Sequence, residues 1–262
     1  MWVLRGLRNG VVTTRWPARR DGYADQVRGP ARVLGRLPGG GADLPGLCPT
    51  GAITWLPGDG ARLDQGRCIS CGRCVRARPD VFGWSAGPAV AALTPAALVT
   101  PQARESDEEL ARLRAGLRQR TRALGRSVHV RHVDAGSDGS DEWEVLALLN
   151  PVYDVHRLGV FFTASPRHAD VLLVTGAGAN GMAAPLRRTY DAMPAPKVVI
   201  AAGTDAVGGG LVSPSYATGG GIGEVVPVDV WVPGSPPSPF HLLHALLLGL
   251  GRLRGAAAGV TP

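Results

Sequence analysis

The 262-residue chain is poor in lysine, in aromatic residues and in cysteine. Aromatic side chains make up 5% of the sequence and charged ones 19%, whereas 45% of the residues are hydrophobic, which is enough for a core and excludes a chain that is disordered throughout. Lysine occurs only at Lys197, so the net charge of +7 comes from arginine. A net charge of this size is weak evidence for nucleic acid, and we expect no nucleic-acid partner.

Long apolar runs are also absent. The longest one, from Leu242 to Leu250, contains His244 and is far shorter than the roughly 20 residues that span a bilayer. The apolar N-terminus is interrupted by Arg5 and Arg8 and lacks the features of a signal peptide. We therefore expect a protein without a membrane span of its own, in a reducing compartment, where closely spaced cysteines bind metals more often than they form disulfides.

The first part of the sequence, residues 1–100, is rich in Arg, Gly and Pro and has few periodic apolar runs. A domain of this composition needs something other than a large core to hold it together, and a metal cluster would serve. Ser106 to Glu109 then form a capping-box pattern, which four leucines follow at helical spacing between Leu110 and Leu124. This pattern predicts a helix over 106–124 within a linker over 101–127.

Residues 128–262 alternate short apolar runs with helical segments. This order predicts an α/β fold with a mostly parallel, doubly wound sheet. The segment from Asn180 to Met193 predicts a helix, with Pro185 near its first turn, where proline is tolerated. The expected strands cover 128–133, 159–164, 171–174, 198–202 and 228–232.

The four cysteines have the spacing of an iron–sulfur ligand set. Cys68, Cys71 and Cys74 form a C-x2-C-x2-C run, which lets three thiolates converge on one cubane from a single loop. In bacterial ferredoxins the fourth cysteine of such a run binds the other cluster, so Cys48, which precedes Pro49, is the expected partner. Together the four predict one complete [4Fe–4S] cluster, and a structural zinc site or free thiols are the alternatives.

The ligands of a second ferredoxin cluster are missing as a group. Arg78 stands where the run would have its fourth cysteine, and residues 34–47, where a first run would lie, contain no cysteine. The segment thus resembles a two-cluster ferredoxin domain that keeps one site. The remaining run is flanked by cations that we expect to favour the reduced, more negative cluster and so to raise its potential, namely Arg67, Arg73, Arg76 and Arg78.

The second half of the sequence resembles a known family of electron-transfer proteins over residues 128–252. The segments that carry the resemblance are 134–144 (DAGSDGSDEWE), 149–154 (LNPVYD), 164–176 (ASPRHADVLLVTG), 186–197 (LRRTYDAMPAPK) and 228–239 (VDVWVPGSPPSP). They are similar to the small iron–sulfur subunit of group 4 [NiFe] hydrogenases such as formate hydrogenlyase, the counterpart of the 20-kDa subunit of respiratory complex I. Residues 1–100, with LRNGVVTTRWP at 7–17, resemble the ferredoxin-like subunit of the same complexes. The chain therefore resembles a fusion of two adjacent electron-transfer subunits.

The resemblance implies a flavodoxin-like α/β domain with one [4Fe–4S] cluster on four cysteines, none of which is present here. The cysteine pair after the first strand aligns with Asp138 and Asp141, the third cysteine aligns with Asp205 and the fourth with Ser235. Oxygen ligands suit Mg, Ca or Mn better than a sulfide-rich cubane, so we expect no second cluster. The alternative is a different metal held by the three carboxylates, with Ser235 adjacent.

These observations predict an electron-transfer subunit of a hydrogenase-like or complex I-like oxidoreductase complex, with one working [4Fe–4S] cluster and no catalytic centre of its own. The resemblance implies that its partners are the large subunit of such a complex and other electron-transfer and membrane subunits. It also implies a place on the cytoplasmic face of the inner membrane, reached through those partners. A docking or assembly subunit without a redox role is the alternative.

Overall fold

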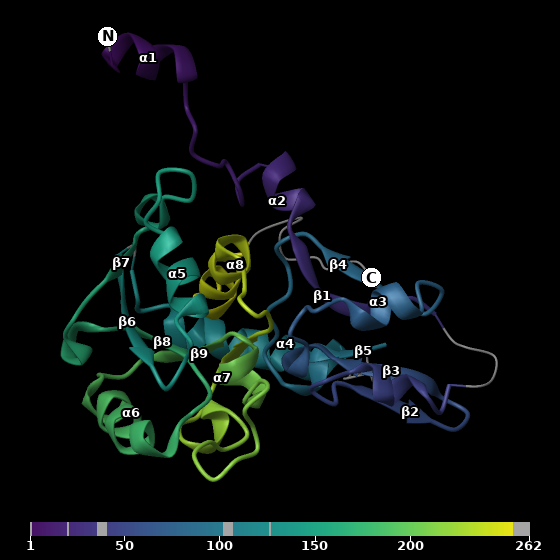
Figure 1. Ribbon diagram of the computed structural model, residues 1–262. Helices are drawn as coiled ribbons and strands as arrows, with labels where there is room; N and C mark the ends of the chain where they lie inside the picture. The colour runs from purple at the N-terminus through teal and green to yellow at the C-terminus, as the bar shows by residue number, and fades with distance from the viewer. Residues whose placement is uncertain (1, 20, 36–40, 102–106, 126, 254–262) are drawn as a thin grey trace.

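The computed structural model describes residues 2–19, 21–35, 41–101, 107–125 and 127–253. Within these ranges the strands form three sheets: a two-stranded and a three-stranded antiparallel sheet in the N-terminal part, and a five-stranded parallel sheet in the C-terminal part (Figure 1). The fold class is therefore α/β with a flavodoxin-like parallel sheet, as the sequence predicts.

The parallel sheet has the strand order β10-β9-β8-β6-β7. All five predicted strands are confirmed, as β6 (Val128–Asp134), β7 (Val160–Phe162), β8 (Val171–Thr175), β9 (Val198–Ala202) and β10 (Val230–Val232). Every residue of β8 and β9 is buried. Successive side chains of these strands point to opposite faces, so both faces of the sheet are apolar and need a cover.

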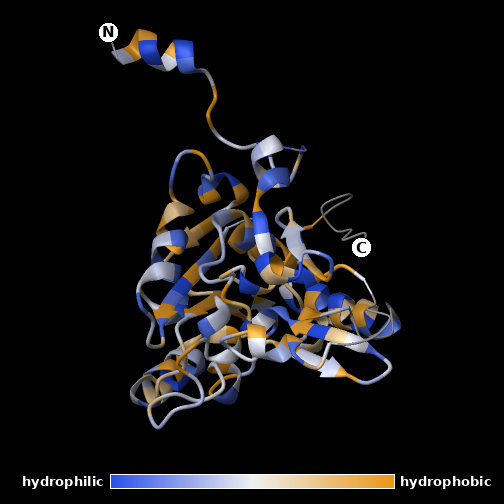
Figure 2. Cartoon of the chain, turned by 45° about the vertical axis from the view of Figure 1, so that its right-hand side comes forward, coloured by the Kyte–Doolittle hydropathy of each residue, from blue (hydrophilic) through white to orange (hydrophobic). Residues whose placement is uncertain are grey.

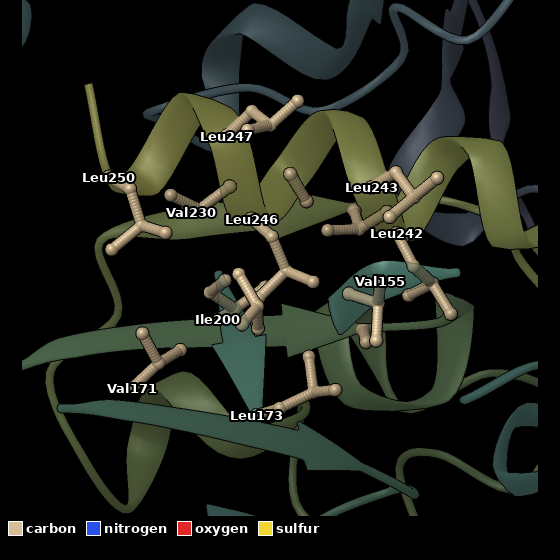
Figure 3. Close-up of a cluster of buried hydrophobic side chains, with 14 of the residues drawn as sticks. Val155, Val171, Leu173, Ile200, Val230, Leu242, Leu243, Leu246, Leu247 and Leu250 are labelled. Atoms are coloured by element: carbon tan, nitrogen blue, oxygen red, sulfur yellow. The ribbon is translucent and has the colours of Figure 1, made fainter. Parts of the chain in front are cut away.

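Helices cover the two faces of the parallel sheet. On one face lie α5 (Ser140–Ala147) and α8 (Pro239–Gly249), whose Leu242, Leu243 and Leu246 pack over Ile200 (Figure 3). On the other face lie α6 (Asn180–Ala192), with Leu186 in the core, and the short α7 (Thr204–Gly208). The longest apolar stretch of the sequence is thus a core helix. In the described part of the chain, no helix has the length and apolar character needed to cross a membrane.

The N-terminal part is built from short elements. Strand β1 (Arg28–Val33) pairs with β4 (Phe82–Ala86), and β3 (Gly60–Asp64) pairs with both β2 (Ile53–Leu56) and β5 (Val99–Thr100). The helices of this part are α1 (Trp2–Asn9), α2 (Gly22–Gln26) and α3 (Arg73–Ala77). Its core is small and includes Cys68 and Cys74 among the buried residues. The 3-10 helices among the described residues are η1 (Leu44–Leu47), η2 (Gln65–Arg67), η3 (Ala96–Leu98), η4 (Val155–Leu158), η5 (Pro166–His168) and η6 (Ile222–Glu224).

Helix α4 (Asp107–Thr121) confirms the predicted helix, but most of it faces solvent. Of its leucines only Leu117 is buried, whereas Leu113 is 41% exposed. The helix is fixed to the α/β part by Leu117 and by an ion pair between Arg120 and Asp229. Its predicted start at Ser106, the first residue of the capping box, lies outside the described residues.

The segment before β1 crosses over to the α/β part. The N–H of Thr14 donates to the carbonyl of Val152 at 2.8 Å. The buried ring of Trp16 meets Phe240 of α8 edge-on, with ring centres 6.1 Å apart. Helix α1, by contrast, projects away from the rest of the molecule (Figure 2), and none of its residues is buried. Residues from both ends of the sequence thus share one core.

Candidate functional site

All four cysteines line one cavity in the N-terminal part. Cys48 ends η1, Cys68 ends η2, Cys71 lies in the following loop and Cys74 lies in α3. The cavity has a volume of about 20 Å³ and opens to solvent, and its wall is otherwise apolar, with Ala31, Ile53 and Leu63 among its residues. No disulfide links the cysteines. The structure therefore brings together the ligand set that the spacing predicts.

Backbone geometry turns the loop so that three thiols face one cavity. Gly72 starts α3 with φ +72°, and Ser70 has φ +53°. A Cβ on Gly72 would lie 3.0 Å from both the Arg76 guanidinium and the Trp84 ring. Glycine adopts such a φ without strain and leaves room for the close approach of these two side chains. The left-handed turns at these two residues thus allow the run of three cysteines to wrap around the cavity.

Hydrogen bonds tie the Cys48 segment to the Cys68 segment. The Thr50 hydroxyl donates to the carbonyl of Arg67 at 2.6 Å and lies 3.3 Å from the Cys48 sulfur. The N–H of Ala52 also donates to that sulfur, at 3.3 Å. Amide hydrogen bonds of this kind stabilise a sulfur that carries negative charge and tune iron–sulfur centres.

Two of the four thiols, those of Cys68 and Cys74, are poorly suited to ionise without a cation. Burial, and then the neighbouring Cys68, raise the pKa of Cys74 to about 11. Burial also raises the pKa of Cys68, although backbone N–H groups at Ala31 and Ser70 act in the opposite direction. A bound metal deprotonates a coordinating thiol outright, because its charge outweighs the loss of hydration. The donor set and the raised pKa values therefore fit a site whose thiolates are stabilised by metal.

The described His, Cys, Asp and Glu side chains include no group of three that could hold a single metal ion.

The second candidate site lies at the carboxyl ends of the parallel strands. Asp138 follows β6, Asp141 is in the first turn of α5, and Asp205 is in the first turn of α7, directly after β9. The three carboxylates interact, because Asp138 and Asp205 each raise the pKa of Asp141. Ser235 is exposed and follows Gly234, which exchanges backbone and side-chain hydrogen bonds with Thr204 at the start of α7. The structure thus gathers the positions at which the resembling family has cysteines.

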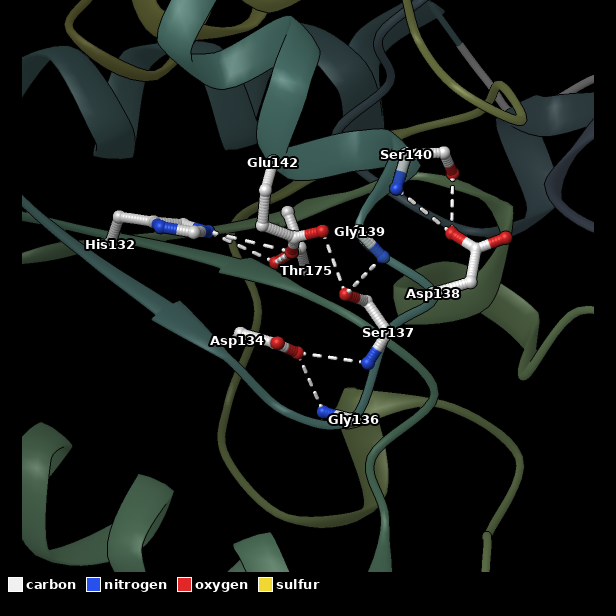
Figure 4. Close-up of polar contacts among 9 residues, drawn as sticks. All are labelled: His132, Asp134, Gly136, Ser137, Asp138, Gly139, Ser140, Glu142 and Thr175. Carbon is white, nitrogen blue, oxygen red and sulfur yellow. Dashed lines mark hydrogen bonds and ion pairs between the residues drawn. The ribbon is translucent and has the colours of Figure 1, made fainter.

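The three aspartates differ in their surroundings. Asp138 is exposed, and its carboxylate accepts hydrogen bonds from the N–H and the hydroxyl of Ser140 at 2.9 and 2.6 Å (Figure 4). Asp141 is 3% exposed, and burial is the main reason why its pKa rises to about 8. Asp205 is half-buried, and burial likewise raises its pKa, followed by the charges of Asp138 and Glu142. Only the exposed aspartate is thus stabilised as an anion.

The two sites are joined by Thr204. Its hydroxyl donates to the carbonyl of Cys68 at 3.0 Å and accepts from the N–H of Gly234 at 3.3 Å. Close packing supports the contact, since a Cβ on Gly66 would lie 2.7 Å from the Val207 side chain. The loop that carries three cysteines therefore rests directly on α7, at the edge of the second site.

Comparison with known proteins identifies the family of the C-terminal part of the chain. The family model of the 20-kDa subunit of NADH:ubiquinone oxidoreductase matches residues 139–248. The probable membrane-bound hydrogenase subunit mbhJ of Pyrococcus furiosus is 40% identical over 157 residues, which are 60% of this chain and 94% of that protein. The chain belongs to this 20-kDa-subunit family.

Two further proteins are similar to parts of the chain. Formate hydrogenlyase subunit 7 of Escherichia coli is 39% identical over 147 residues, 56% of this chain and 56% of that protein. In a solved structure of a membrane-bound sulfane sulfur reductase, an archaeal respiratory membrane complex, one chain is 27% identical and aligns with a TM-score of 0.44, over 50% of this chain and 74% of that one.

Several polar residues near the second site were not singled out from the sequence, although some of them lie in the segments that resemble the family. Glu142 accepts hydrogen bonds from Ser137 at 2.7 Å and from the buried Thr175, and it lies 3.9 Å from His132 (Figure 4). Thr204 carries the contact to the cysteine loop. The one available signal is position, because sites in open parallel sheets gather at the carboxyl ends of the strands.

Proposed function

We propose that this chain is an electron-transfer subunit that holds one [4Fe–4S] cluster on Cys48, Cys68, Cys71 and Cys74. The observation that carries the proposal is the convergence of two separate cysteine segments on a single cavity. Such a cluster supplies one-electron redox chemistry. The role of this chain's own residues is to hold it, to shield it with the apolar wall of the cavity, and to direct N–H groups at its sulfurs.

The second site supports no cluster of its own in this proposal. Asp138, Asp141, Asp205 and Ser235 offer only oxygen atoms, which bind a sulfide-rich cubane poorly. The Asp138 carboxylate already accepts a hydrogen bond from Ser140, and Ser235 is exposed. The α/β part then has the fold of its family and contributes docking, while the N-terminal part contributes the redox centre.

We propose that the partner is the large subunit of a hydrogenase-like or complex I-like complex, together with other electron-transfer and membrane subunits. The names of two relatives, a membrane-bound hydrogenase subunit and a formate hydrogenlyase subunit, support such an assembly. The chain would then lie at the cytoplasmic face of the inner membrane through those partners. An exposed apolar stripe on α5 and the turn after it, formed by Trp143, Leu146 and Leu149, fits a protein interface.

Anaerobic purification with metal analysis and EPR tests the redox role. We expect about four irons and four sulfides per chain and an EPR signal after reduction. Cys68→Ser removes both, whereas the control Ser70→Gly, which changes the same loop and suits its φ of +53°, keeps them. One zinc per chain, or an absence of iron in the wild type, would refute the proposal.

Co-purification tests the docking role separately. We expect Trp143→Ala combined with Leu146→Asp to reduce recovery of the large subunit, while Trp2→Ala on the projecting α1 leaves it unchanged. If partners are recovered with the wild type but no iron–sulfur signal accompanies them, the chain is a docking or assembly subunit without a redox role.

A further inference from the structure

Helix α1 and the short segment after it hold large apolar side chains that lie mostly in solvent. The exposed fraction of these side chains ranges from 53% at Val3 to 84% at Trp2. The helix projects from the rest of the molecule (Figure 2), and none of its residues is buried. Val11 and Val12, which follow the helix, are exposed as well. A group of exposed apolar side chains that follow one another in this way marks a contact surface.

The helix separates its apolar side chains from its basic ones. Val3, Leu4 and Leu7 are three or four residues apart, so they lie on one side of the helix. Arg5 and Arg8 are three residues apart and lie on the other side. Neither arginine forms an ion pair with a carboxylate among the described residues. Helix α1 is thus amphipathic, and the cations on its polar side are available to a partner.

The charge around this helix has a single sign. Residues 1–20 contain five arginines and no Asp or Glu. Arg15 and Arg19, which lie between α1 and α2, are exposed like the arginines of the helix. A surface that attracts this segment therefore carries negative charge. Because the helix also has an apolar side, that surface needs an apolar layer within reach. The surface of a bilayer that contains anionic phospholipids offers both.

We propose that α1 is a membrane-surface anchor, which lies flat among the headgroups of an anionic bilayer with Val3, Leu4 and Leu7 directed at the acyl chains. Its eight residues extend over about 12 Å, whereas the apolar layer of a bilayer is about 30 Å thick, so the helix lies on the membrane and does not cross it. This contact is independent of the proposed cluster. It adds direct binding of lipid to the contacts through partner subunits.

Other partners fit the two sides of α1 less well. A nucleic acid would bind the arginines but would leave Leu4 and Leu7 in water. A groove on a protein could cover the leucines, but it needs a shape that matches both the helix and the non-helical segment with Val11 and Val12. A bilayer requires no such match, because its acyl chains adapt to the side chains that enter them. The charge and the irregular apolar surface together therefore favour lipid.

Vesicle flotation of the purified chain at low salt tests the anchor. We expect the chain to float with vesicles of phosphatidylglycerol and phosphatidylcholine in equal parts, and to remain in the dense fractions with phosphatidylcholine alone. High salt reduces the binding, because it screens the attraction between the arginines and the anionic headgroups. A chain that does not float with the anionic vesicles would overturn the proposal. The assay requires no iron, so its result does not depend on the proposed function.

A paired substitution on the polar side tests the role of the charge. Arg5→Gln combined with Arg8→Gln is expected to lower the partition coefficient for anionic vesicles roughly 30-fold, because each basic residue near such a surface contributes about fivefold. The matched control, Arg187→Gln combined with Arg188→Gln, changes two exposed arginines of α6 and leaves the coefficient unchanged. Equal losses in the two double variants would show that net charge, and not α1, is responsible, and would overturn the proposal.

A second pair tests the apolar side at constant charge. We expect Leu4→Ser combined with Leu7→Ser to abolish flotation, whereas Leu211→Ser, at a position 62% exposed in the loop after α7, retains it. Since no residue of α1 is buried, the circular dichroism spectrum and the stability of the α1 variant stay close to those of the wild type. Unchanged flotation of this variant, together with a loss of the large subunit during its purification, would mean that α1 contacts a protein and not lipid.

Discussion

The four arginines around the cysteine run do not contribute equally to its charge. Arg76 donates to the carbonyl of Cys71 at 3.2 Å and lies against Gly72, within the loop itself. Arg78 forms an ion pair with Asp80 at 2.7 Å, so its charge is offset by a neighbour. Arg67 and Arg73 are exposed. The sequence predicts basic residues around the cysteines, and the structure adds that Arg76 of α3 bonds to the cysteine loop and forms no ion pair with a described carboxylate.

We expect Arg76→Gln to lower the midpoint potential of the proposed cluster by about 30 mV, a threefold change in the equilibrium constant for one electron. Loss of a nearby cation disfavours the more negative, reduced state. The shift in Arg78→Gln is smaller because Asp80 already offsets that charge. Arg5→Gln on the projecting α1 serves as the control and leaves the potential unchanged. Equal potentials for Arg76→Gln and the wild type, measured by redox titration, would contradict this role.

Two buried histidines on α8 make the fold sensitive to acid. His241 is 2% exposed and His244 is 4% exposed, and burial lowers the pKa of each from 6.5 to about 4. The nearby charges of His241 and of Arg114 from α4 lower that of His244 further. Both side chains are therefore neutral in the folded protein at pH values where they would be charged in the unfolded chain.

The free energy of unfolding is predicted to fall as the pH drops from 6.5 toward 4, by at most about 3 kcal/mol for each of these histidines. In that range the unfolded chain binds protons that the folded chain does not. His244→Gln reduces the pH dependence, and His168→Gln, at an exposed position, leaves it unchanged. Denaturant unfolding at pH 7 and pH 5 measures the difference, and parallel curves for His244→Gln and wild type would be the contrary result.

At the scale of elements, the parallel sheet was predictable because β8 and β9 are almost continuous apolar runs and β6 has apolar residues at regular intervals. Every residue of the run Val198–Ala202 is buried, so the strand is apolar throughout and can be predicted without an alternation of polar and apolar residues. The antiparallel strands of the N-terminal part were not predicted, because segments such as Arg28–Val33 have no regular apolar pattern. The convergence of the cysteines was predictable from spacing alone, since three ligands lie in one loop.

The contact between α7 and the cysteine loop was not predictable, because a single threonine after a strand carries no motif. Thr204 is fully buried and makes its hydrogen bond to a residue far away in the sequence, Cys68. The packing of Asp141 against Gly203 is hidden for the same reason. Both contacts join residues that are far apart in the sequence, and no local pattern encodes them.

Thr204→Val is predicted to lower the free energy of unfolding by about 1–3 kcal/mol, because it leaves the Cys68 carbonyl and the N–H of Gly234 without their partner in a buried place. The change also weakens the attachment of the cysteine loop to α7. We therefore expect iron at the proposed site to be lost to a chelator faster than in the wild type. Thr204→Ser retains the hydroxyl and restores most of both properties. Unaltered stability together with unaltered iron loss in the valine variant would show that the contact is unimportant.

At the scale of the whole molecule, the two parts are not independent. Trp16 and Ala24, from the N-terminal segment, and Val90 belong to the same core cluster as the leucines of α8. Ala92 forms an antiparallel bridge with Trp231 in β10, the edge strand of the parallel sheet. The sequence predicts a boundary near residue 100 from composition, whereas the packing links residues on both sides of that boundary.

A matched pair of tryptophans tests this shared core. Trp16→Ala is predicted to lower the free energy of unfolding by about 3–5 kcal/mol, because Trp16 is 6% exposed and contacts Phe240. Trp2→Ala changes it by less than about 0.5 kcal/mol, because Trp2 is 84% exposed on α1. Denaturant unfolding followed by circular dichroism compares the two variants. Similar losses in both would mean that the N-terminal segment does not complete the core.

The contact between Trp16 and Phe240 also constrains the order in which the protein is made. The partners lie near opposite ends of the sequence, so during synthesis Trp16 leaves the ribosome long before α8 exists to cover it. Chains rich in such distant contacts fold slowly and expose apolar surface while they wait. The nascent N-terminal segment therefore keeps the ring of Trp16 uncovered by α8 until that helix has been translated.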